Sequence, residues 1–466
     1  MPTNEYPPAR RDSHKSAAIL VGDAPILRPV RSAARAERAD SCERLAPSVP
    51  GPPATARHAV LATGPPAREG PTGNLRVPSS AADLQELPPA APAARSREFG
   101  LDWLRVGAFA ILIAYHTGMY FVPWPWFVKN PRSSEALSWA MSFFAVWRLP
   151  LLFFISGAGT WFNLGRRGPG AFVGERATRL LVPLLFGMLV VCPPQTYVER
   201  LAAGLHYRSY LDFWETLFSF VPYPRGNLTW IHLWFLPYLF TFSVLALPLL
   251  GFLRGARGRA LVERLATFCE RPGRIYLFAL PNVAATLALA PFWPRTDNLV
   301  ADWAHFVNSF LAFLYGFLIC SSERFLRLVQ RKRKEFAWAA FAAALTFYAL
   351  LATDRLHPLP PAARFAAGTV IECALALAMI LALVAFAREK LDRDGPGLRR
   401  ANVAVYPWYV IHQTITVLLG WYWRGWDLPL GIKYALLLTG TLLGTWLAYE
   451  IIRRTRVTRV LFGMRA

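Results

Sequence analysis

Ten long apolar runs, separated by short loops, limit what this chain can fold into. Most are close to the roughly 20 residues that a helix needs to cross the hydrocarbon core of a bilayer. With 54% hydrophobic residues and a mean hydropathy of +0.29, the chain is too apolar for an ordinary soluble domain. We therefore predict an all-α polytopic membrane protein with about ten transmembrane helices. The runs lie at about 99–122, 137–164, 177–197, 230–252, 274–291, 303–321, 335–353, 365–387, 402–421 and 431–452.

The basic residues are distributed unevenly between the loops. Alternate loops are rich in Lys and Arg, which predicts that these loops are cytoplasmic. With ten spans, both termini are then expected on the cytoplasmic side. The formal net charge of +22 does not indicate a nucleic acid partner, because the arginines cluster between apolar runs as membrane loops require. The clusters lie at 166–179, 254–274, 324–334, 388–400 and 453–465.

Three parts of the chain differ in composition. Residues 1–96 are rich in Pro, Ala and Arg and cannot bury enough apolar surface to offset chain entropy, so we predict a disordered cytoplasmic tail without a cleavable signal. Residues 97–455 are predicted to form the membrane domain, and 456–466 a short basic cytoplasmic tail. The outer loop at 198–229 holds an aromatic amphipathic stretch, expected either along the membrane surface or as a simple connector. The five cysteines are scattered without metal or disulfide spacing, so no metal site is predicted.

The first apolar run carries two residues that a bilayer normally rejects. Arg105 and His116 are separated by roughly three helical turns, or about 16 Å of helical rise, and share one face of the helix. Ionisable residues at membrane depth usually face a bundle interior or a wet cavity, which makes both functional candidates. The alternative is structural, with Arg105 reaching the interface and His116 bonding a neighbouring helix.

Arg176 and Arg179 lie three residues apart at the start of the third run and share a helix face. Two guanidiniums beside the free N–H groups of a helix N-terminus form a phosphate site. The alternative is that both only anchor the cytoplasmic end of the helix.

Other polar or aromatic residues within the runs are candidates for substrate contacts or for packing. Arg148 and Glu372 are placed at similar depth, which predicts an intramembrane ion pair of structural character. Ser156, next to Gly157, belongs to a small-residue patch that favours close helix approach. The remaining candidates are His232, Trp234, Tyr406 and His412.

Taken in order, five motifs resemble the acyltransferase-3 family of integral membrane acyltransferases, over about residues 97–455. The chain is similar to the branch that includes the glucan biosynthesis protein C succinyltransferases. The motifs are LDWLR at 101–105 followed by the R-x(10)-H spacing, FFISG at 153–157, RATRLLVP at 176–183, HLWFLPYLF at 232–240 and YPWYVIH at 406–412.

The resemblance implies transfer of an acyl group, acetyl or succinyl, from acyl-CoA to a hydroxyl of a cell-envelope carbohydrate or glycan. It implies acyl-CoA as a co-substrate without a bound cofactor, and a multi-pass location in a bacterial-type inner membrane. His116 matches the family's essential histidine and Arg105 its motif arginine, while Arg176 and Arg179 match the pair associated with the acyl donor. No esterase-type domain follows the last run, so the resemblance is to a membrane-only member.

The residues support this chemistry independently of the resemblance. A neutral imidazole suits removal of a hydroxyl proton near pH 7, and the reaction also needs oxyanion donors, for which Ser156, a tryptophan N–H or a backbone group are candidates. A covalent acyl-histidine relay is a second mechanism. Because His116 lies near the outer end of its run, we expect acylation on the outer side, the alternative being an inner-face reaction on a lipid-linked sugar. The rival functions are a transporter of an anionic glycan or lipid precursor and a structural scaffold.

Overall fold

The computed structural model describes residues 98–164, 168–353 and 358–465. Helices dominate these residues, and the single bridge found among them joins Pro222 and Leu228. The predicted all-α membrane fold is therefore confirmed. The predicted disordered tail at 1–96 lies outside the described residues.

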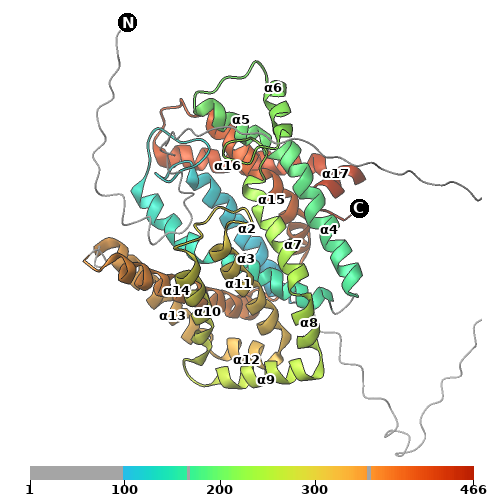
Figure 1. The fold of residues 1–466 in the computed structure, drawn as a ribbon, viewed down its shortest axis with the longest axis vertical. Helices are drawn as coiled ribbons and strands as arrows, with labels where there is room; N and C mark the ends of the chain where they lie inside the picture. Colours follow the sequence, from blue (N-terminus) through green and yellow to red (C-terminus); the bar gives the residue numbers. More distant parts are fainter. Residues whose placement is uncertain (1–97, 165–167, 354–357, 466) are drawn as a thin grey trace, which may run out of the picture. The chain divides into compact units, whose positions relative to one another are not determined.

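Helices occupy all ten predicted runs, although not all of them qualify as spans (Figure 1). Seven are long and apolar enough to cross a membrane, and eight if a pair bent by 48° forms one span. Polar residues keep α2 outside this count, and the helical segment Arg274–Leu289 is too short, so the number ten stays a prediction, as does the side of each terminus. The helices in the runs are α2 (Phe99–Met119), α3 (Glu135–Leu164), α4 (Pro169–Phe186) with α5 (Pro193–Ala202), α7 (Phe235–Leu245) with α8 (Leu247–Arg254), α10 (Ala279–Leu289), α11 (Trp303–Ser321), α13 (Arg333–Thr353), α14 (Pro361–Lys390), α15 (Pro396–Tyr422) and α16 (Leu430–Ile452).

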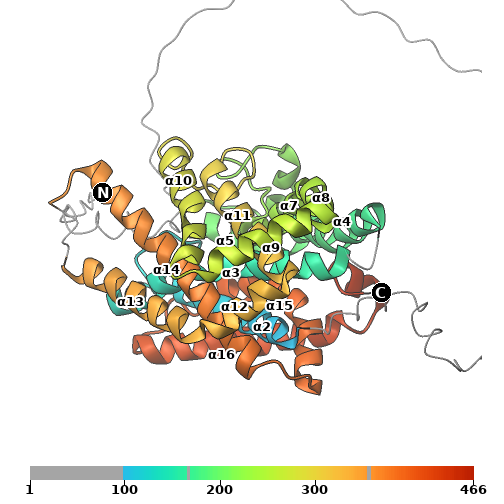
Figure 2. The same ribbon diagram turned by 90° about the horizontal axis from the view of Figure 1, so that it is seen from below.

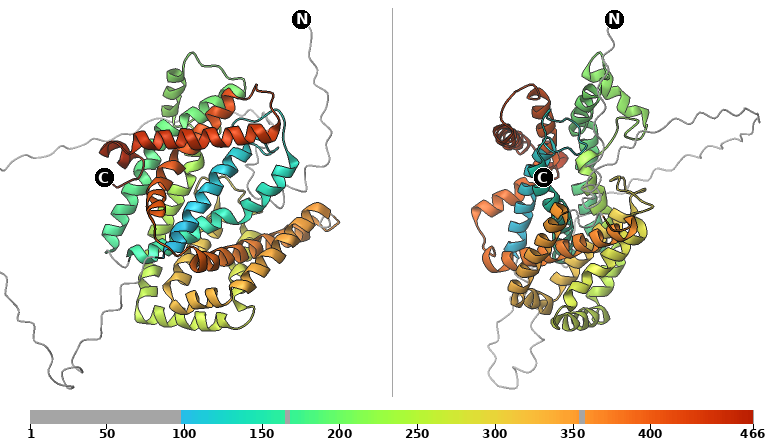
Figure 3. Two further views of the ribbon diagram at one scale, coloured as in Figure 1. Left: turned by 180° about the vertical axis from the view of Figure 1, so that it is seen from behind. Right: turned by 90° about the vertical axis from the view of Figure 1, so that its left-hand side faces the viewer.

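Helix α2 packs against the helix that follows it, α3, and against α14, α15 and α16 from the C-terminal part of the chain. Seen from behind, α2 (blue) runs between the α13–α14 pair (orange) and α16 (red) (Figure 3). Arg105 and His116 therefore have neighbouring helices beside them, as expected because an ionisable side chain that faces lipid costs free energy.

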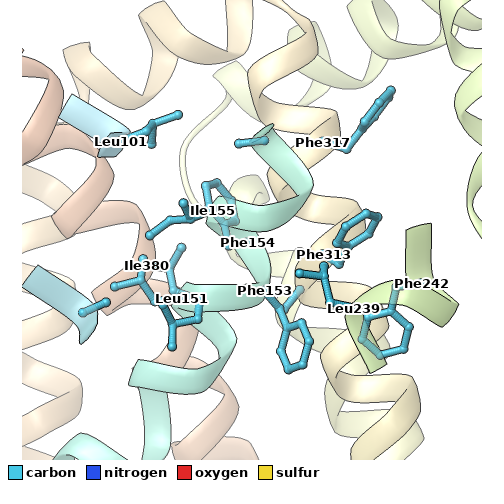
Figure 4. Close-up of a cluster of buried hydrophobic side chains, with 14 of the residues drawn as sticks. Leu101, Leu151, Phe153, Phe154, Ile155, Leu239, Phe242, Phe313, Phe317 and Ile380 are labelled. Atoms are coloured by element: carbon cyan, nitrogen blue, oxygen red, sulfur yellow. The ribbon is translucent and has the colours of Figure 1, made fainter. Parts of the chain in front are cut away.

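The densest packing joins α3 to α11 and is made possible by two glycines. A Cβ at Gly157 would lie 1.8 Å from the Phe313 carbonyl oxygen, and one at Gly316 would lie 1.8 Å from the Phe154 carbonyl oxygen. Phe153 and Phe154 pack beside them in the buried core, together with side chains of α7 and α14 (Figure 4). The predicted close helix approach at the FFISG motif is therefore confirmed.

Two loops that were predicted only as cytoplasmic connectors are helical. Helices α9 (Ala256–Glu270) and α12 (Glu323–Arg331) lie side by side (Figure 2). Arg324 and Arg331 form ion pairs across them, at 3.6 Å to Glu263 and 3.1 Å to Glu270. Their charged faces lower the mean hydropathy of these segments, so hydropathy predicted loops.

Between α4 and α5 the chain makes a π-helical turn, Gly187–Val191, which directs α5 toward α15. The loop that follows, which the sequence predicts on the outer side, contains α6 (Tyr210–Glu215) and two 3₁₀ turns, Thr216–Ser219 and Ile231–Trp234. Phe213 is buried in it, whereas Leu211 and Phe220 are 67% and 73% exposed. This is the apolar face expected of an interfacial segment.

Candidate active site

A cavity of about 430 Å³ opens beside the C-terminal half of α2. Its walls come from α2, α3, α15 and the Ile231–Trp234 turn, and its rim comes from the loops at 120–134, 221–230 and 292–302. The lining is mostly apolar and rich in aromatic rings, with polar groups placed among them, which is the usual make-up of a small-molecule site. The polar and charged lining residues are His116, Lys129, Arg148, Glu199, Thr229, His232, Arg295, Thr296, Asp297 and Gln413.

His116 lies in the cavity wall and is paired with a second histidine behind it. The His116 Nδ1 and His412 Nε2 atoms are 3.0 Å apart, and the two rings are stacked with centroids 5.1 Å apart. On its other side, His412 Nδ1 lies 2.8 Å from the Tyr409 carbonyl oxygen and 3.1 Å from that of Trp408. His412 is fully buried, so it reaches the cavity only through His116.

A third histidine, His232, completes this wall. Its Nε2 atom donates to the Val410 carbonyl oxygen at 2.9 Å, and the Tyr409 hydroxyl donates to the His232 carbonyl oxygen at 2.6 Å. Gln195 on α5 holds α15 from the far side through the Thr414 hydroxyl at 2.7 Å. Among the described residues, no group of three His, Cys, Asp or Glu side chains is placed to hold a metal ion.

Arg148 faces the same cavity, but not in the predicted ion pair. Its guanidinium lies 3.3 Å from the centroid of the Tyr115 ring, a close cation–π contact. Glu372 is on α14, where its Oε1 atom is buried without a hydrogen-bond partner, and no ion pair joins it to Arg148 among the described residues. The predicted Arg148–Glu372 ion pair is therefore wrong: similar depth in two helices does not determine the direction in which either side chain points.

The rim of the cavity is held by charged groups. Lys129 donates to the carbonyl oxygens of Met119, at 2.6 Å, and of Val122. Burial lowers the pKa of Lys129 to about 8. Arg295 and Asp297 form an ion pair at 2.9 Å, so these two rim charges compensate each other.

One buried carboxylate organises the rim loop at 292–302. The Asp302 Oδ2 atom accepts from the Tyr238 hydroxyl at 2.9 Å and from the Asp297 N–H at 2.8 Å. Burial, reinforced by the nearby Asp297 charge, raises the pKa of Asp302 to about 6. Asp297 and Leu299 both have positive φ, 56° and 58°, a strained conformation that these bonds sustain.

A second polar cluster lies toward the other end of α2. Arg105 is held by Asp102, at 3.0 Å, and by the Asn402 side chain of α15, at 2.5 Å. Arg105 is also within electrostatic range of Arg176 on α4. The structure thus groups Arg105 with Arg176, while about three turns of α2 separate Arg105 from His116.

The α4 arginines complete this cluster, called the inner cluster after the cytoplasmic side on which the sequence predicts it. Arg176 donates to the Thr160 hydroxyl at 3.1 Å, and Arg179 lies 3.8 Å from Glu175. Arg176 Nε and the Tyr406 hydroxyl are buried without hydrogen-bond partners. The sequence predicts the two arginines beside the free N–H groups of a helix N-terminus, where both would bind phosphate. This placement is wrong, because α4 begins at Pro169, about two turns before Arg176.

The other sequence candidates divide between the two clusters and the core. His232 and Trp234 line the cavity, and Tyr406 belongs to the inner cluster. The Ser156 hydroxyl donates to the Leu152 carbonyl oxygen within its own helix, at 2.8 Å, outside the cavity. Ser156 is therefore poorly placed as an oxyanion donor.

A family model for an acyltransferase domain matches residues 98–450. The chain belongs to the acyltransferase-3 family. The predicted family is therefore confirmed, and the chain is a multi-pass membrane protein and an acyltransferase. No curated protein and no solved structure matches it.

The matched region contains both the cavity and the inner arginine cluster. Sequence reasoning missed the pairing of His116 with His412, and it missed the rim loop organised by Asp302. His412 was a candidate as a histidine inside an apolar run and as the last residue of the YPWYVIH motif, but neither signal pairs it with His116.

Proposed function

We propose that this acyltransferase moves an acetyl or succinyl group from acyl-CoA to a hydroxyl of a cell-envelope carbohydrate or glycan, in a bacterial-type inner membrane. The observation that carries the proposal is a histidine in the wall of a cavity rich in aromatic rings, on the same helix as Arg105 of the inner arginine cluster. We also propose that the acyltransferase belongs to the glucan biosynthesis protein C branch.

The cavity suits a carbohydrate acceptor. Sugar rings present apolar C–H faces that pack on aromatic rings and hydroxyls that bond to polar groups. Both kinds of partner are present, since Glu199 and Asp297 lie among the aromatic lining. The aromatic residues that line the cavity are Phe109, Tyr115, Trp124, Trp126, Phe127, Tyr223, Trp230, Trp234, Phe235 and Tyr409.

The inner cluster suits the phosphates of acyl-CoA. Guanidiniums bind phosphate oxygens through paired N–H donors, and here arginines outnumber the carboxylates that contact them. The pantetheine arm then passes between α2 and α15, where Phe109 and Tyr409 pack edge to face with ring centroids 5.5 Å apart. We expect these two rings to move apart when the donor binds.

The reaction that this arrangement would support balances without a further reagent. His116 takes the proton of the acceptor hydroxyl as its oxygen attacks the thioester carbonyl. A C–O bond forms and the C–S bond breaks, and the protonated His116 returns the proton to the departing CoA sulfur. The alternative acyl-histidine route places the acyl group on His116 before the acceptor enters.

Incubation of the purified full chain with labelled acetyl-CoA or succinyl-CoA and envelope glycan tests the proposal. We expect labelled ester on the glycan and release of free CoA. Omission of the glycan separates the two mechanisms, because only the relay leaves label on the protein. Glycan that stays unlabelled with both donors, or glycan that crosses vesicle membranes without being acylated, would contradict the proposal.

Sidedness is tested by a cysteine at the cavity rim. Thr296 lines the cavity and is exposed, so Thr296→Cys, in a background without Cys42 and Cys373, should react with an impermeant thiol reagent added outside. Acceptor should protect this cysteine. Thr178→Cys on α4 is the matched inner control and should label only after the membrane is opened. The reverse labelling pattern would favour an inner-face reaction.

A further inference from the structure

The hydrogen bonds of His412 determine which of its nitrogens carries a proton. Its Nδ1 atom lies 2.8 Å and 3.1 Å from two backbone carbonyl oxygens, which can only accept. Nδ1 must therefore be the N–H donor. In a neutral imidazole, Nε2 is then an unprotonated acceptor.

A doubly protonated His412 is disfavoured by its surroundings. The ring is fully buried within an apolar helix. The charged side chain that faces the neighbouring His116 is Arg148, and a second buried cation beside it would cost several kcal/mol. The neutral form with a bare Nε2 is thus the consistent state.

The state of His116 follows from that of His412. Its Nδ1 lies 3.0 Å from the bare His412 Nε2, so Nδ1 must carry the proton and donate it. The opposite tautomer would place two lone pairs face to face at this distance. The nitrogen left for the cavity, His116 Nε2, is unprotonated and able to act as a base.

We propose that His412 is a positioning residue that holds His116 in the Nδ1–H tautomer, so that Nε2 is always ready to accept the hydroxyl proton. The inference rests on the proposed acyl transfer and deepens it. When Nε2 takes the proton, the Nδ1–H bond to His412 strengthens, because its donor becomes charged. His412 does not take up a proton itself, since its own Nδ1–H stays bonded to the carbonyls.

Two substitutions at His412 separate this role from simple packing. His412→Leu removes the acceptor, whereas His412→Gln provides an amide oxygen near the position of Nε2. We expect kcat to fall at least about ten-fold in His412→Leu, as when an orienting partner of a functional histidine is lost. KM for both substrates should stay unchanged, and His412→Gln should recover part of kcat.

Thr416→Val is the matched control. Thr416 is fully buried one turn further along α15, and its hydroxyl donates to the His412 carbonyl oxygen at 2.9 Å. This variant removes a bond to the His412 backbone but leaves the side-chain hydrogen bonds of the histidine pair in place. It should therefore keep wild-type kcat, and a loss equal to that of His412→Leu would reduce His412 to a packing residue.

Nitrogen NMR of the reconstituted protein with ¹⁵N-labelled histidine provides a readout that does not depend on activity. Signals of His116 are assigned by their loss in His116→Asn. The wild type should show Nδ1 protonated and Nε2 bare in His116, and His412→Leu should lose this single tautomer. A wild-type His116 with a protonated Nε2 would overturn the inference even if His412→Leu fails to fold.

The outcomes distinguish the inference from the proposed function. Wild-type protein that transfers no acyl group contradicts the function, while the tautomer measurement still stands. Wild-type protein that transfers the group, together with full kcat in a folded His412→Leu variant, overturns only the role of His412.

Discussion

The two ends of α2 each carry an ionisable residue, and the surroundings of these two residues differ. The cavity beside His116 is rich in aromatic rings, and its charged residues are spread among them: Lys129, Arg148, Glu199, Arg295 and Asp297. Arg105 lies instead with the two arginines of α4. One helix thus connects an aromatic pocket, suited to a sugar ring and its hydroxyl groups, with a cluster of guanidiniums, suited to phosphates. We expect substitutions at the two ends to change different kinetic constants.

The largest effect is expected at the cavity end. His116→Ala removes the proposed base, so the rate of acyl transfer should fall by about 10² to 10⁴. The dissociation constant of CoA should stay unchanged, because the arginine cluster is untouched. Single-turnover transfer and calorimetric CoA binding measure the two quantities. Near-normal transfer by a well-folded His116→Ala protein would rule out the role of His116.

At the inner end, the double change Arg176→Gln and Arg179→Gln should weaken acyl-CoA binding between about 10- and 100-fold, as expected for lost hydrogen bonds to charged groups. The value of kcat at saturating donor should change little.

A ligand control sharpens the test of these two arginines. Acyl-pantetheine lacks the nucleotide phosphates, so the double variant and the wild type should use it equally well. Arg257→Gln with Arg264→Gln, on the exposed face of α9, is the matched protein control. Equal loss with acyl-pantetheine would mean that the pair supports the fold instead of binding phosphate.

Substitution of Arg105 tests whether this residue acts in donor binding or in the chemical step. The sequence resemblance grouped it with His116 as catalytic, whereas the geometry groups it with Arg176. Arg105→Gln should therefore raise KM for acyl-CoA, by about ten-fold or ~1.4 kcal/mol, and leave kcat nearly unchanged. A fall in kcat at constant KM would assign Arg105 to the chemical step.

Much of the fold could be predicted from hydropathy, because an apolar run of membrane length has few alternatives to a helix. Helices α9 and α12 were not predicted, since their charged residues give them the low hydropathy of loops. The helix breaks at 246 and 192 were not predicted either. They depend on local backbone geometry within continuous apolar stretches.

The candidate site was only partly predictable. Spacing along one helix placed Arg105 and His116, because the helical repeat alone determines their separation. The pairing of His116 with His412 needs the register between α2 and α15, which is set by tertiary packing. The same reason explains why the Arg148–Glu372 pair was wrong, since depth was estimated but rotation about each helix axis was not.

The smallest effect is expected from the rim loop, through Asp302. Its pKa is raised from 3.8 to about 6, so the folded state holds this proton more tightly than the unfolded chain does. The stabilisation from protonated Asp302 is thus complete below about pH 4 and is lost as the pH rises through 6. The melting temperature should fall by a few degrees over this interval, because 1 kcal/mol moves the Tm of a mid-sized domain by about 2–4 °C.

Asp302→Asn keeps an oxygen that can accept from Tyr238 and removes the titration, so its melting temperature should lose this part of the pH dependence. Thermal unfolding in detergent between pH 4 and 7 measures the difference. Asp427→Asn, at a carboxylate whose side chain is 81% exposed, is the control and should follow the wild type. Because Asp302 supports only the rim, the CoA affinity of the inner cluster should be identical in all three proteins. A change in CoA affinity would show that the two regions are coupled through α2, and a wild-type pH dependence in Asp302→Asn would assign the titration to another group.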